Sequence, residues 1–198
     1  MPQVSEEYLE NRKKMIAKSA LCVFSKKGYS NTSMKDIMNE ADISRGGLYA
    51  HFKNIDAVFI AALMYDDALQ ANQLTILDLD KPILPQLNDW IYKTVQSVQD
   101  EKFNLVRAKS EFFLSHDIKS EPYLRKRYER LSETIKDLID VGIKKGEFKK
   151  TTDKDSFCEL LISMMDGVML HQYYQYSSNF SLVDVLSLIS KMIESYLT

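Results

Sequence analysis

The chain has 198 residues, of which 45% are hydrophobic and 27% charged, and its formal net charge is −2. These values are typical of a globular protein with one or two domains, and they exclude a chain that is basic overall. The N-terminus has no apolar signal region, and no apolar run approaches the roughly 18 residues of a membrane span. Cys22 and Cys158 are too isolated for a zinc site or a disulfide framework. We therefore expect a protein of the reducing cytoplasm with no membrane partner.

From Arg12 onward the first segment has the spacing of an amphipathic helix. The stretch RKKMIAKSALCVFSKKGY places Ile16, Ala20 and Phe24 on one face. Gly28 follows two lysines, and this combination is a stop signal for a helix. We therefore predict a helix that begins near Arg12 and ends before Gly28.

Two shorter helices are predicted to follow. The stretch TSMKDIMNEA begins with Ser33, and Asp36 lies three residues later, which is a capping-box arrangement. After the three-residue link DIS, Ser44 is a suitable N-cap for the stretch SRGGLYAHF. Three helices with such a link between the second and the third are typical of a helix-turn-helix unit.

The remainder of the chain is also expected to be helical. A longer helix starts at about Asp56, and the stretch DLDKPILP, with Pro82 and Pro85, is the clearest break in the chain. No sustained alternation of apolar and polar residues favours a strand. The further predicted helices lie near residues 86–100, 103–116, 120–145, 153–175 and 181–197.

These patterns predict an all-α fold with two domains. Residues 1–55 would form an N-terminal three-helix helix-turn-helix domain, and residues 56–198 a C-terminal helical domain. Residues 1–60 carry nine Lys or Arg against seven Asp or Glu, whereas the rest carries 17 against 21. The charge balance is therefore +2 and −4, and its sign suits a nucleic-acid-facing N-terminus.

The stretch SRGGLYAHF contains two adjacent glycines, although each glycine costs a helix interior about 1 kcal/mol relative to alanine. At 100° per residue, Leu48 and Phe52 point inward, while Gly46, Gly47 and Ala50 form a bare opposite face that we call the glycine strip. Such a face suits a helix that enters a major groove about 12 Å wide. The glycines equally suit a helix start packed against protein, so the pattern leaves both interpretations open. The longer side chains beside the strip are Arg45, Tyr49 and His51.

The segment MIAKSALCVFSKKGYSNTSMKDIMNEADISRGGLYAHFKNIDAVF resembles the DNA-binding domain of the tetracycline-repressor (TetR) family of bacterial transcriptional regulators. The matching features are A…F…KGY in the first helix, TSMKDI at the start of the second, and the linked set A-x-I-S-x-G-x-L-Y-x-H-F. The rest of the chain matches only in its helical pattern, and its last two helices look like the family's dimerising pair. The resemblance implies that residues 56–198 form a ligand-binding and dimerisation domain. It further implies a homodimer that binds a double-stranded DNA operator and an unknown small-molecule effector.

The resemblance also implies roles for single residues. Ser33 matches a helix cap that contacts a phosphate, Tyr49 matches a phosphate-binding tyrosine, and Lys53 should lie against the DNA backbone. Arg45 is the candidate for reading a guanine, because its guanidinium can donate two hydrogen bonds to O6 and N7. The implied DNA-binding set is Ser33, Lys35, Arg45, Gly46, Gly47, Tyr49, His51 and Lys53.

Two positions depart from the family pattern. Many members carry a lysine at the start of the fourth helix, where this chain has Ile55, so a backbone contact is missing or has moved to Lys53 or Asn54. Asp42 replaces the usual turn glycine, and aspartate tolerates the left-handed conformation that such a turn needs.

The resemblance places an effector site among the C-terminal helices. Aromatic and methionine side chains at helical spacing are more often core or dimer interface, so both interpretations stay open. His116 and His171 have no second ligand at helical spacing, and we therefore expect no metal and no cofactor. The candidate pocket residues are Trp90, Phe112, Phe113, Met164, Met165 and His171.

The sequence contains no phosphate-binding glycine loop, no nucleophile motif and no metal pair, so we do not expect an enzyme. Arg125, Arg127 and Arg130 would form a basic groove if the ligand were acidic, although a solvated helix face is the simpler interpretation. Together the residues and the resemblance predict a repressor that binds a palindromic operator as a homodimer and is released by an effector. The alternative is a helical ligand-binding module without operator-specific DNA binding.

Overall fold

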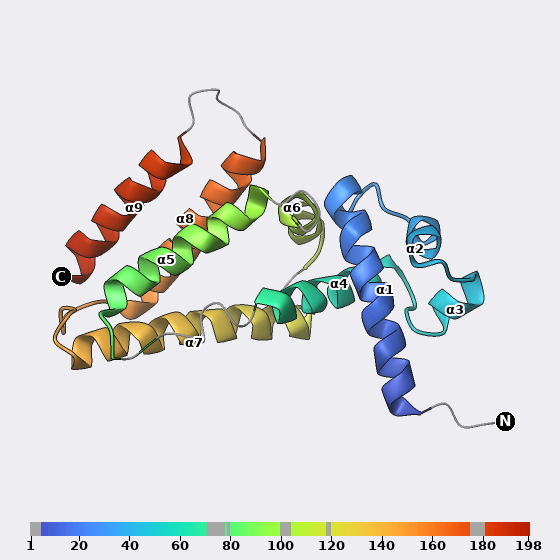
Figure 1. Ribbon diagram of the computed structural model, residues 1–198, viewed down its shortest axis with the longest axis horizontal. Helices are drawn as coiled ribbons and strands as arrows, with labels where there is room; N and C mark the ends of the chain where they lie inside the picture. Colours follow the sequence, from blue (N-terminus) through green and yellow to red (C-terminus); the bar gives the residue numbers. More distant parts are fainter. Residues whose placement is uncertain (1–4, 71–77, 79, 100–103, 118–119, 175–180) are drawn as a thin grey trace. The chain divides into compact units, whose positions relative to one another are not determined.

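The structure is a computed structural model that describes residues 5–70, 78, 80–99, 104–117, 120–174 and 181–198. These residues form helices and their connections, without a strand among them, which confirms the all-α prediction (Figure 1). The chain divides into two compact units. Residues 1–72 and 100–117 make up the first unit, and residues 73–99 and 118–198 the second. The predicted domain boundary between residues 55 and 56 stays a prediction.

The first unit contains α1 (Glu6–Lys27), α2 (Met34–Ala41), α3 (Arg45–Tyr49), α4 (Ile55–Gln70) and α6 (Val106–Ser115). Helix α1 packs along α4 and α2, and it also contacts α6, which comes from a distant part of the sequence. Ile16, Ala20 and Phe24 are buried on the packed face of α1, as their spacing predicted. The first unit is therefore built around α1.

The start of α1 differs from the prediction. The helix begins at Glu6 rather than near Arg12, so it is longer by more than a turn. The hydroxyl of Ser5 accepts a hydrogen bond from the backbone N–H of Tyr8, and Glu6 and Glu7 lie in the first turn. A hydroxyl cap and acidic residues at a helix N-terminus stabilise this end without any buried face.

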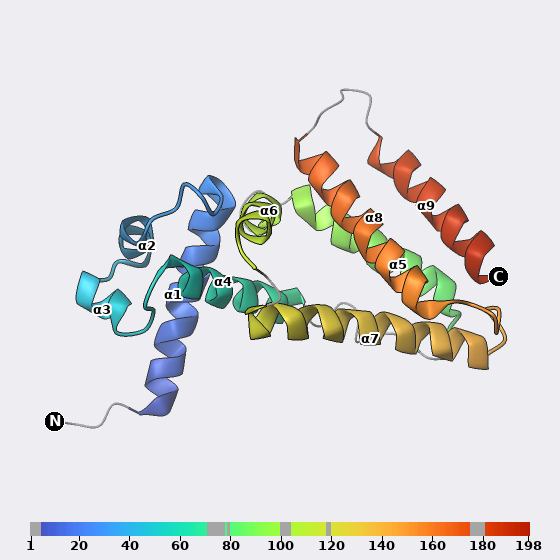
Figure 2. The ribbon, with the colours of Figure 1, turned by 180° about the vertical axis from the view of Figure 1, so that it is seen from behind.

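The second unit contains α5 (Ile83–Gln96), the short 3-10 helix η1 (Ser97–Gln99), α7 (Pro122–Lys144), α8 (Lys154–Tyr174) and α9 (Leu182–Leu197). Their bounds lie within a few residues of the predicted helices. Figure 2 shows the four long helices of this unit from behind. The side chains at its centre come from all four of them, and Cys158 belongs to this core as expected. The buried core residues include Leu87, Trp90, Ile91, Ile135, Ile139, Leu161, Met165, Leu186 and Ile189.

Two residues at the C-terminal end of α7 and just beyond it fix the local packing: Glu147 caps the start of α5, and Gly142 accommodates the ring of Phe148. Pro82 precedes α5 and offers no side-chain cap, so the carboxylate of Glu147 accepts a hydrogen bond from the Ile83 N–H at 2.6 Å instead. In the last turns of α7, a Cβ added at Gly142 would fall on the ring of Phe148, whose Cγ lies 2.8 Å away. Glycine at position 142 is therefore required for this packing.

Neither a membrane-spanning helix nor a cluster of metal ligands occurs in the described part of the chain. Its helices include none that is long and apolar enough to cross a membrane. No group of three or more His, Cys, Asp or Glu residues within it could hold a metal ion.

Candidate DNA-binding surface

The N-terminus of α2 is held by the predicted capping box. The Ser33 hydroxyl accepts a hydrogen bond from the Asp36 N–H, and the Asp36 carboxylate accepts one from the Ser33 N–H at 2.9 Å. Lys27 donates to the same carboxylate at 2.6 Å. The bond from Lys27, together with those from Ser33, lowers the pKa of Asp36 from its ordinary value of 3.8 to about 2. Asp36 is therefore ionised at neutral pH, and it fixes the first turn of α2 to the end of α1.

The link between α2 and α3 has the conformation that its sequence predicted. Asp42 lies in the left-handed region with φ 49°, and the Ser44 hydroxyl accepts a hydrogen bond from the Gly47 N–H at 3.1 Å. Helix α3 covers only Arg45–Tyr49, and hydrogen-bonded turns continue it to Phe52. Leu48 and Phe52 are both buried, as expected. The inner face of α3 is thus anchored in the first unit.

The glycine strip on the opposite face is free of protein contacts at its centre. Apart from its neighbours along the helix, no described heavy atom lies within 4 Å of the position that a Cβ would take at Gly46. At Gly47 such a Cβ would lie 3.4 Å from the Ser44 hydroxyl oxygen, which is an ordinary van der Waals contact. Packing of Gly46 against protein, one of the two interpretations of the sequence, is therefore wrong. The fold of the free protein does not require these glycines.

The side chains beside the strip are accessible. The guanidinium carbon of Arg45 lies 5.5 Å from the centroid of the Tyr49 ring, a distance typical of a cation–π contact. His51 is half-buried, with its ring tilted against that of Phe52, and Lys53 is exposed on the next turn. On α2, Ser33 and Lys35 are exposed as well. All eight residues of the implied set lie in one unit, and their contact with DNA stays a prediction.

The comparisons with known proteins place both parts of the chain in one family. Residues 16–62 match the sequence profile described as bacterial regulatory proteins of the tetR family. Residues 86–179 match the profile of the tetracyclin repressor-like C-terminal domain. The chain belongs to the TetR family. It is accordingly a DNA-binding transcriptional regulator, as the first helices indicated.

Individual TetR-family relatives agree over most of the chain. The uncharacterized HTH-type transcriptional regulator YfiR of Bacillus subtilis is 25% identical, over 87% of this chain and 85% of its own. A crystal structure of a TetR transcriptional regulator from Chloroflexus aurantiacus is 21% identical and superimposes with a TM-score of 0.76, covering 96% and 98% of the two chains. AibR, crystallised with isovaleryl coenzyme A and operator DNA, is 16% identical with a TM-score of 0.67, covering 91% and 97%.

In this TetR-family chain the six candidate pocket residues occupy different places. Trp90 and Met165 are buried in the core of the second unit. Phe112 and Phe113 belong to α6 in the first unit, where Phe112 stacks on Phe59. The remaining two lie on α8: Met164 is half-buried, and His171 is exposed. That all six line one effector pocket stays a prediction.

Sequence reasoning missed one polar residue of the second unit. Gln172 is only 9% exposed, and neither atom of its side-chain amide has a hydrogen-bond partner among the described residues. A buried amide without a partner is unfavourable by about 1–3 kcal/mol. The signal was present, because Gln172 follows the buried Cys158, Leu161 and Met165 at helical spacing on α8. A single polar residue on an apolar helix face is the sequence signal of a buried polar group.

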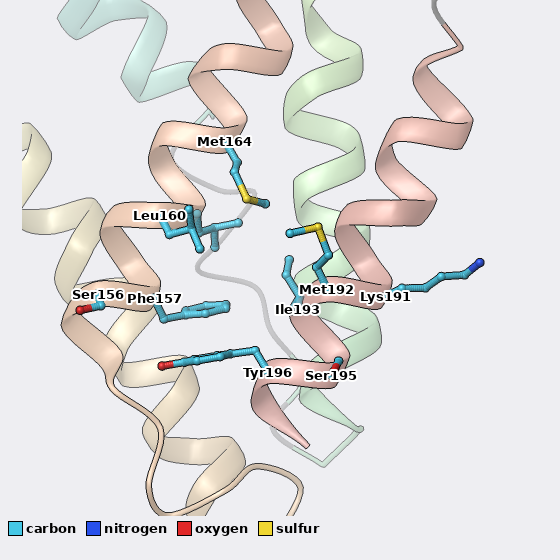
Figure 3. Close-up of a pocket in the computed structure, with 10 residues that line it drawn as sticks. Ser156, Phe157, Leu160, Met164, Lys191, Met192, Ile193, Ser195 and Tyr196 are labelled. Carbon is cyan, nitrogen blue, oxygen red and sulfur yellow. The ribbon is translucent and has the colours of Figure 1, made fainter.

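A groove of about 580 Å³ separates α8 from α9. Phe157 and Tyr196 close one end with parallel rings whose centroids are 5.7 Å apart. Figure 3 shows Leu160 and Met164 of α8 pointing toward Met192 of α9. Leu160 is 56% exposed and Met192 51% exposed, so these helices present a large apolar surface in the single chain.

Proposed function

We propose that the protein is a repressor that binds a palindromic operator as a homodimer and is released by a small-molecule effector. The observation that carries the proposal is the open space at Gly46 on the outer face of α3. Two glycines weaken a helix that is already short, and no contact in the first unit explains them. Close approach of another body explains them, and the surrounding hydrogen-bonding side chains favour DNA.

The DNA contacts would fall into two classes. Arg45 would donate two hydrogen bonds to a guanine, which contributes about 1–3 kcal/mol of discrimination against other bases. Lys35 and Lys53 would bind phosphates, which fix the register of the helix but do not read sequence. In a dimer, two copies of α3 separated by about 34 Å would reach successive major grooves on one side of the duplex.

The surface that supports a homodimer lies on α8 and α9. Leu160, Leu188 and Met192 are large apolar residues that are more than half exposed. Exposed apolar patches of this kind mark interaction sites, and two such helix pairs can bury each other as a four-helix bundle. We infer that the second copy covers the groove between α8 and α9.

The effector would bind within the second unit. Gln172 supplies an amide that can both donate and accept a hydrogen bond, and its partner would be a polar group on an otherwise apolar ligand. Trp90 and Met165 contribute apolar surface to the same unit. Binding would stabilise a conformation whose two α3 helices are wrongly spaced for the operator, so that affinity falls by the coupling free energy. Helix α4 would transmit this conformational change to the α3 helices.

A binding assay tests the DNA-binding part of the proposal. The full chain is titrated against a labelled fragment of its own promoter at several salt concentrations, beside Arg45→Ala and Gly47→Glu. We expect specific, salt-dependent binding that both substitutions abolish, since one removes a guanine contact and the other places a carboxylate in the groove. If wild type shows no preference for any genomic fragment, or Gly47→Glu binds equally well, the protein is instead a ligand-binding module.

Sedimentation tests the dimer. Leu160→Glu would place a charge in an apolar interface, and we expect it to convert the dimer into a monomer that binds the operator more weakly. Lys126→Gln on α7 is the control, because it changes the net charge by the same amount on an exposed position of another helix. A dimeric Leu160→Glu variant would move the interface away from α8 and α9.

A further inference from the structure

Helix α6 is attached to the first unit by side chains at three points. Near its start, the Lys109 ammonium lies 3.2 Å from the Asp66 carboxylate of α4, which is almost fully buried. In the middle, the ring of Phe112 stacks on Phe59 of α4 with centroids 4.6 Å apart. Directly after the helix, the His116 ring packs edge-on against the Tyr29 ring, with centroids 5.4 Å apart. Helix α6 is therefore an integral part of the first unit.

One residue of α6 binds the backbone of the turn between α1 and α2. The Glu111 carboxylate accepts a hydrogen bond from the Ser30 N–H at 2.8 Å and another from the Arg107 guanidinium at 2.6 Å. Burial alone would raise the pKa of Glu111, but these two donors outweigh it and hold the pKa below its ordinary value. The bond to Ser30 is thus made by an ionised acceptor, and charged acceptors form the stronger hydrogen bonds.

The backbone of this turn is shaped to receive the carboxylate. Gly28 has φ +75°, and a Cβ at this position would lie 2.7 Å from both the Glu111 carboxylate and the Arg107 guanidinium. Only glycine combines this conformation with this approach. We call the contact of Glu111 and Arg107 with residues 28–30 the α6 clasp.

Tyr29 fixes the same turn from its other side. Its ring lies edge-on to Phe59 and Phe112, and its hydroxyl donates to the Asp56 carboxylate at 2.5 Å. Burial raises the pKa of Tyr29, and the bond to Asp56 raises it further, so the hydroxyl remains protonated. The imidazole Nε2 of His116 lies 3.3 Å from the same hydroxyl.

The turn leads directly into the predicted DNA contact at Ser33. The buried Thr32 donates its hydroxyl proton to the Gly28 carbonyl at 2.6 Å, and its N–H bonds to the Tyr29 carbonyl at 3.1 Å. Ser33 follows as the cap of α2. The Glu111 carboxylate is therefore bonded to a hydrogen-bonded turn that ends directly before the cap of α2.

We propose that Glu111 is a positioning residue for the N-terminus of α2. Through the α6 clasp, Glu111 holds the turn that precedes Ser33, and it thereby sets the position of Ser33 relative to the operator. This inference rests on the proposed function, because it needs an operator that Ser33 contacts.

The matched variants are Glu111→Ala and Lys109→Ala, each of which removes one charge-assisted link of α6. Glu111→Ala breaks the link to the α1–α2 turn, whereas Lys109→Ala breaks the link to α4. We expect Glu111→Ala to weaken operator binding about tenfold and to speed hydrogen exchange over residues 28–33. Lys109→Ala should leave the operator affinity within about threefold at a temperature where both variants are folded.

Two further variants separate positioning from general support of the fold. Glu111→Gln keeps an oxygen that accepts from Ser30, so its loss of affinity should be smaller than that of Glu111→Ala. In a Ser33→Ala background, Glu111→Ala should have little further effect, because the residue through which it acts is gone. A merely structural role would lower the melting temperature and leave this double-mutant coupling at zero.

The outcomes distinguish this inference from the proposed function. If wild type binds its operator and Glu111→Ala binds as tightly, or Lys109→Ala weakens binding as much, Glu111 is not a positioning residue and only this inference fails. If wild type shows no operator preference, the proposed function fails and this inference fails with it. Unchanged hydrogen exchange over residues 28–33 in Glu111→Ala would also overturn it.

Discussion

Alanine at position 46 or 47 is expected to make the free protein more stable and its DNA complex weaker. Apart from neighbours along the helix, a Cβ at Gly46 meets no described atom within 4 Å, and one at Gly47 touches the Ser44 hydroxyl and Ile43 Cβ at ordinary distances. Neither change therefore introduces a clash. Both reduce the conformational freedom of the unfolded chain, which is the free-energy cost that glycine brings to a helix.

The magnitudes follow from these contacts. Each substitution should raise the free energy of unfolding by about 0.4–1 kcal/mol. For a chain of this size, 1 kcal/mol corresponds to a rise of about 2–4 °C in melting temperature. Operator affinity should fall by about 1–3 kcal/mol, or roughly fivefold to 150-fold, because a methyl group on the glycine strip holds α3 away from the base edges.

Thermal unfolding followed by circular dichroism, and fluorescence anisotropy with the operator fragment, measure the two effects on one sample. Gly142→Ala is the control, since its methyl group would fall on the Phe148 ring and cost about 1–3 kcal/mol of stability. It should lower the melting temperature and leave operator binding unchanged below that temperature. The reasoning is refuted if Gly46→Ala melts lower than wild type, or melts higher and binds the operator as tightly.

Three further outcomes are expected. The pKa of Asp36 in the folded protein, about 2, lies below its ordinary value of 3.8. The contribution of Asp36 to stability is therefore present above pH about 4 and lost as the pH falls through 2. In acid unfolding curves, Asp36→Asn should make the stability depend less on pH over this range. If Tyr49 orients Arg45 by stacking, Tyr49→Phe should keep guanine discrimination and Tyr49→Leu should reduce it, as binding to base-substituted operators will show. Ser44→Ala removes the cap of α3 and should lower stability by about 1 kcal/mol in urea titrations; an unchanged midpoint contradicts that role.

Features governed by neighbouring residues were predictable from the sequence. The capping box of Ser33 and Asp36, the cap at Ser44 and the left-handed Asp42 each depend on residues a few positions apart, and the structure confirms all three. The start of α1 was wrong by more than a turn because the prediction followed apolar spacing, whereas the Ser5 cap stabilises residues with no buried face.

Features that depend on distant residues left no such signal. Glu111 and Ser30 are 81 residues apart, so nothing in the local pattern of either segment indicates that a carboxylate of α6 binds this turn. The sequence around Gly28 likewise indicates only the end of a helix, although the α6 clasp also requires glycine at this position. The contacts of the eight predicted DNA-binding residues depend on a partner outside the chain, and they await the binding assays.

The first unit is assembled from two stretches of chain, with residues 73–99 between them. During synthesis at about 5–20 residues per second, α1 to α4 emerge seconds before α6 does. Throughout that interval the aromatic faces of Tyr29 and Phe59 lack Phe112, their later neighbour. A fragment ending after α4 would keep this apolar surface uncovered, with the aggregation risk that such surfaces carry. A chimera that is to carry this DNA-binding unit on another protein must therefore include residues 104–117 together with the first four helices.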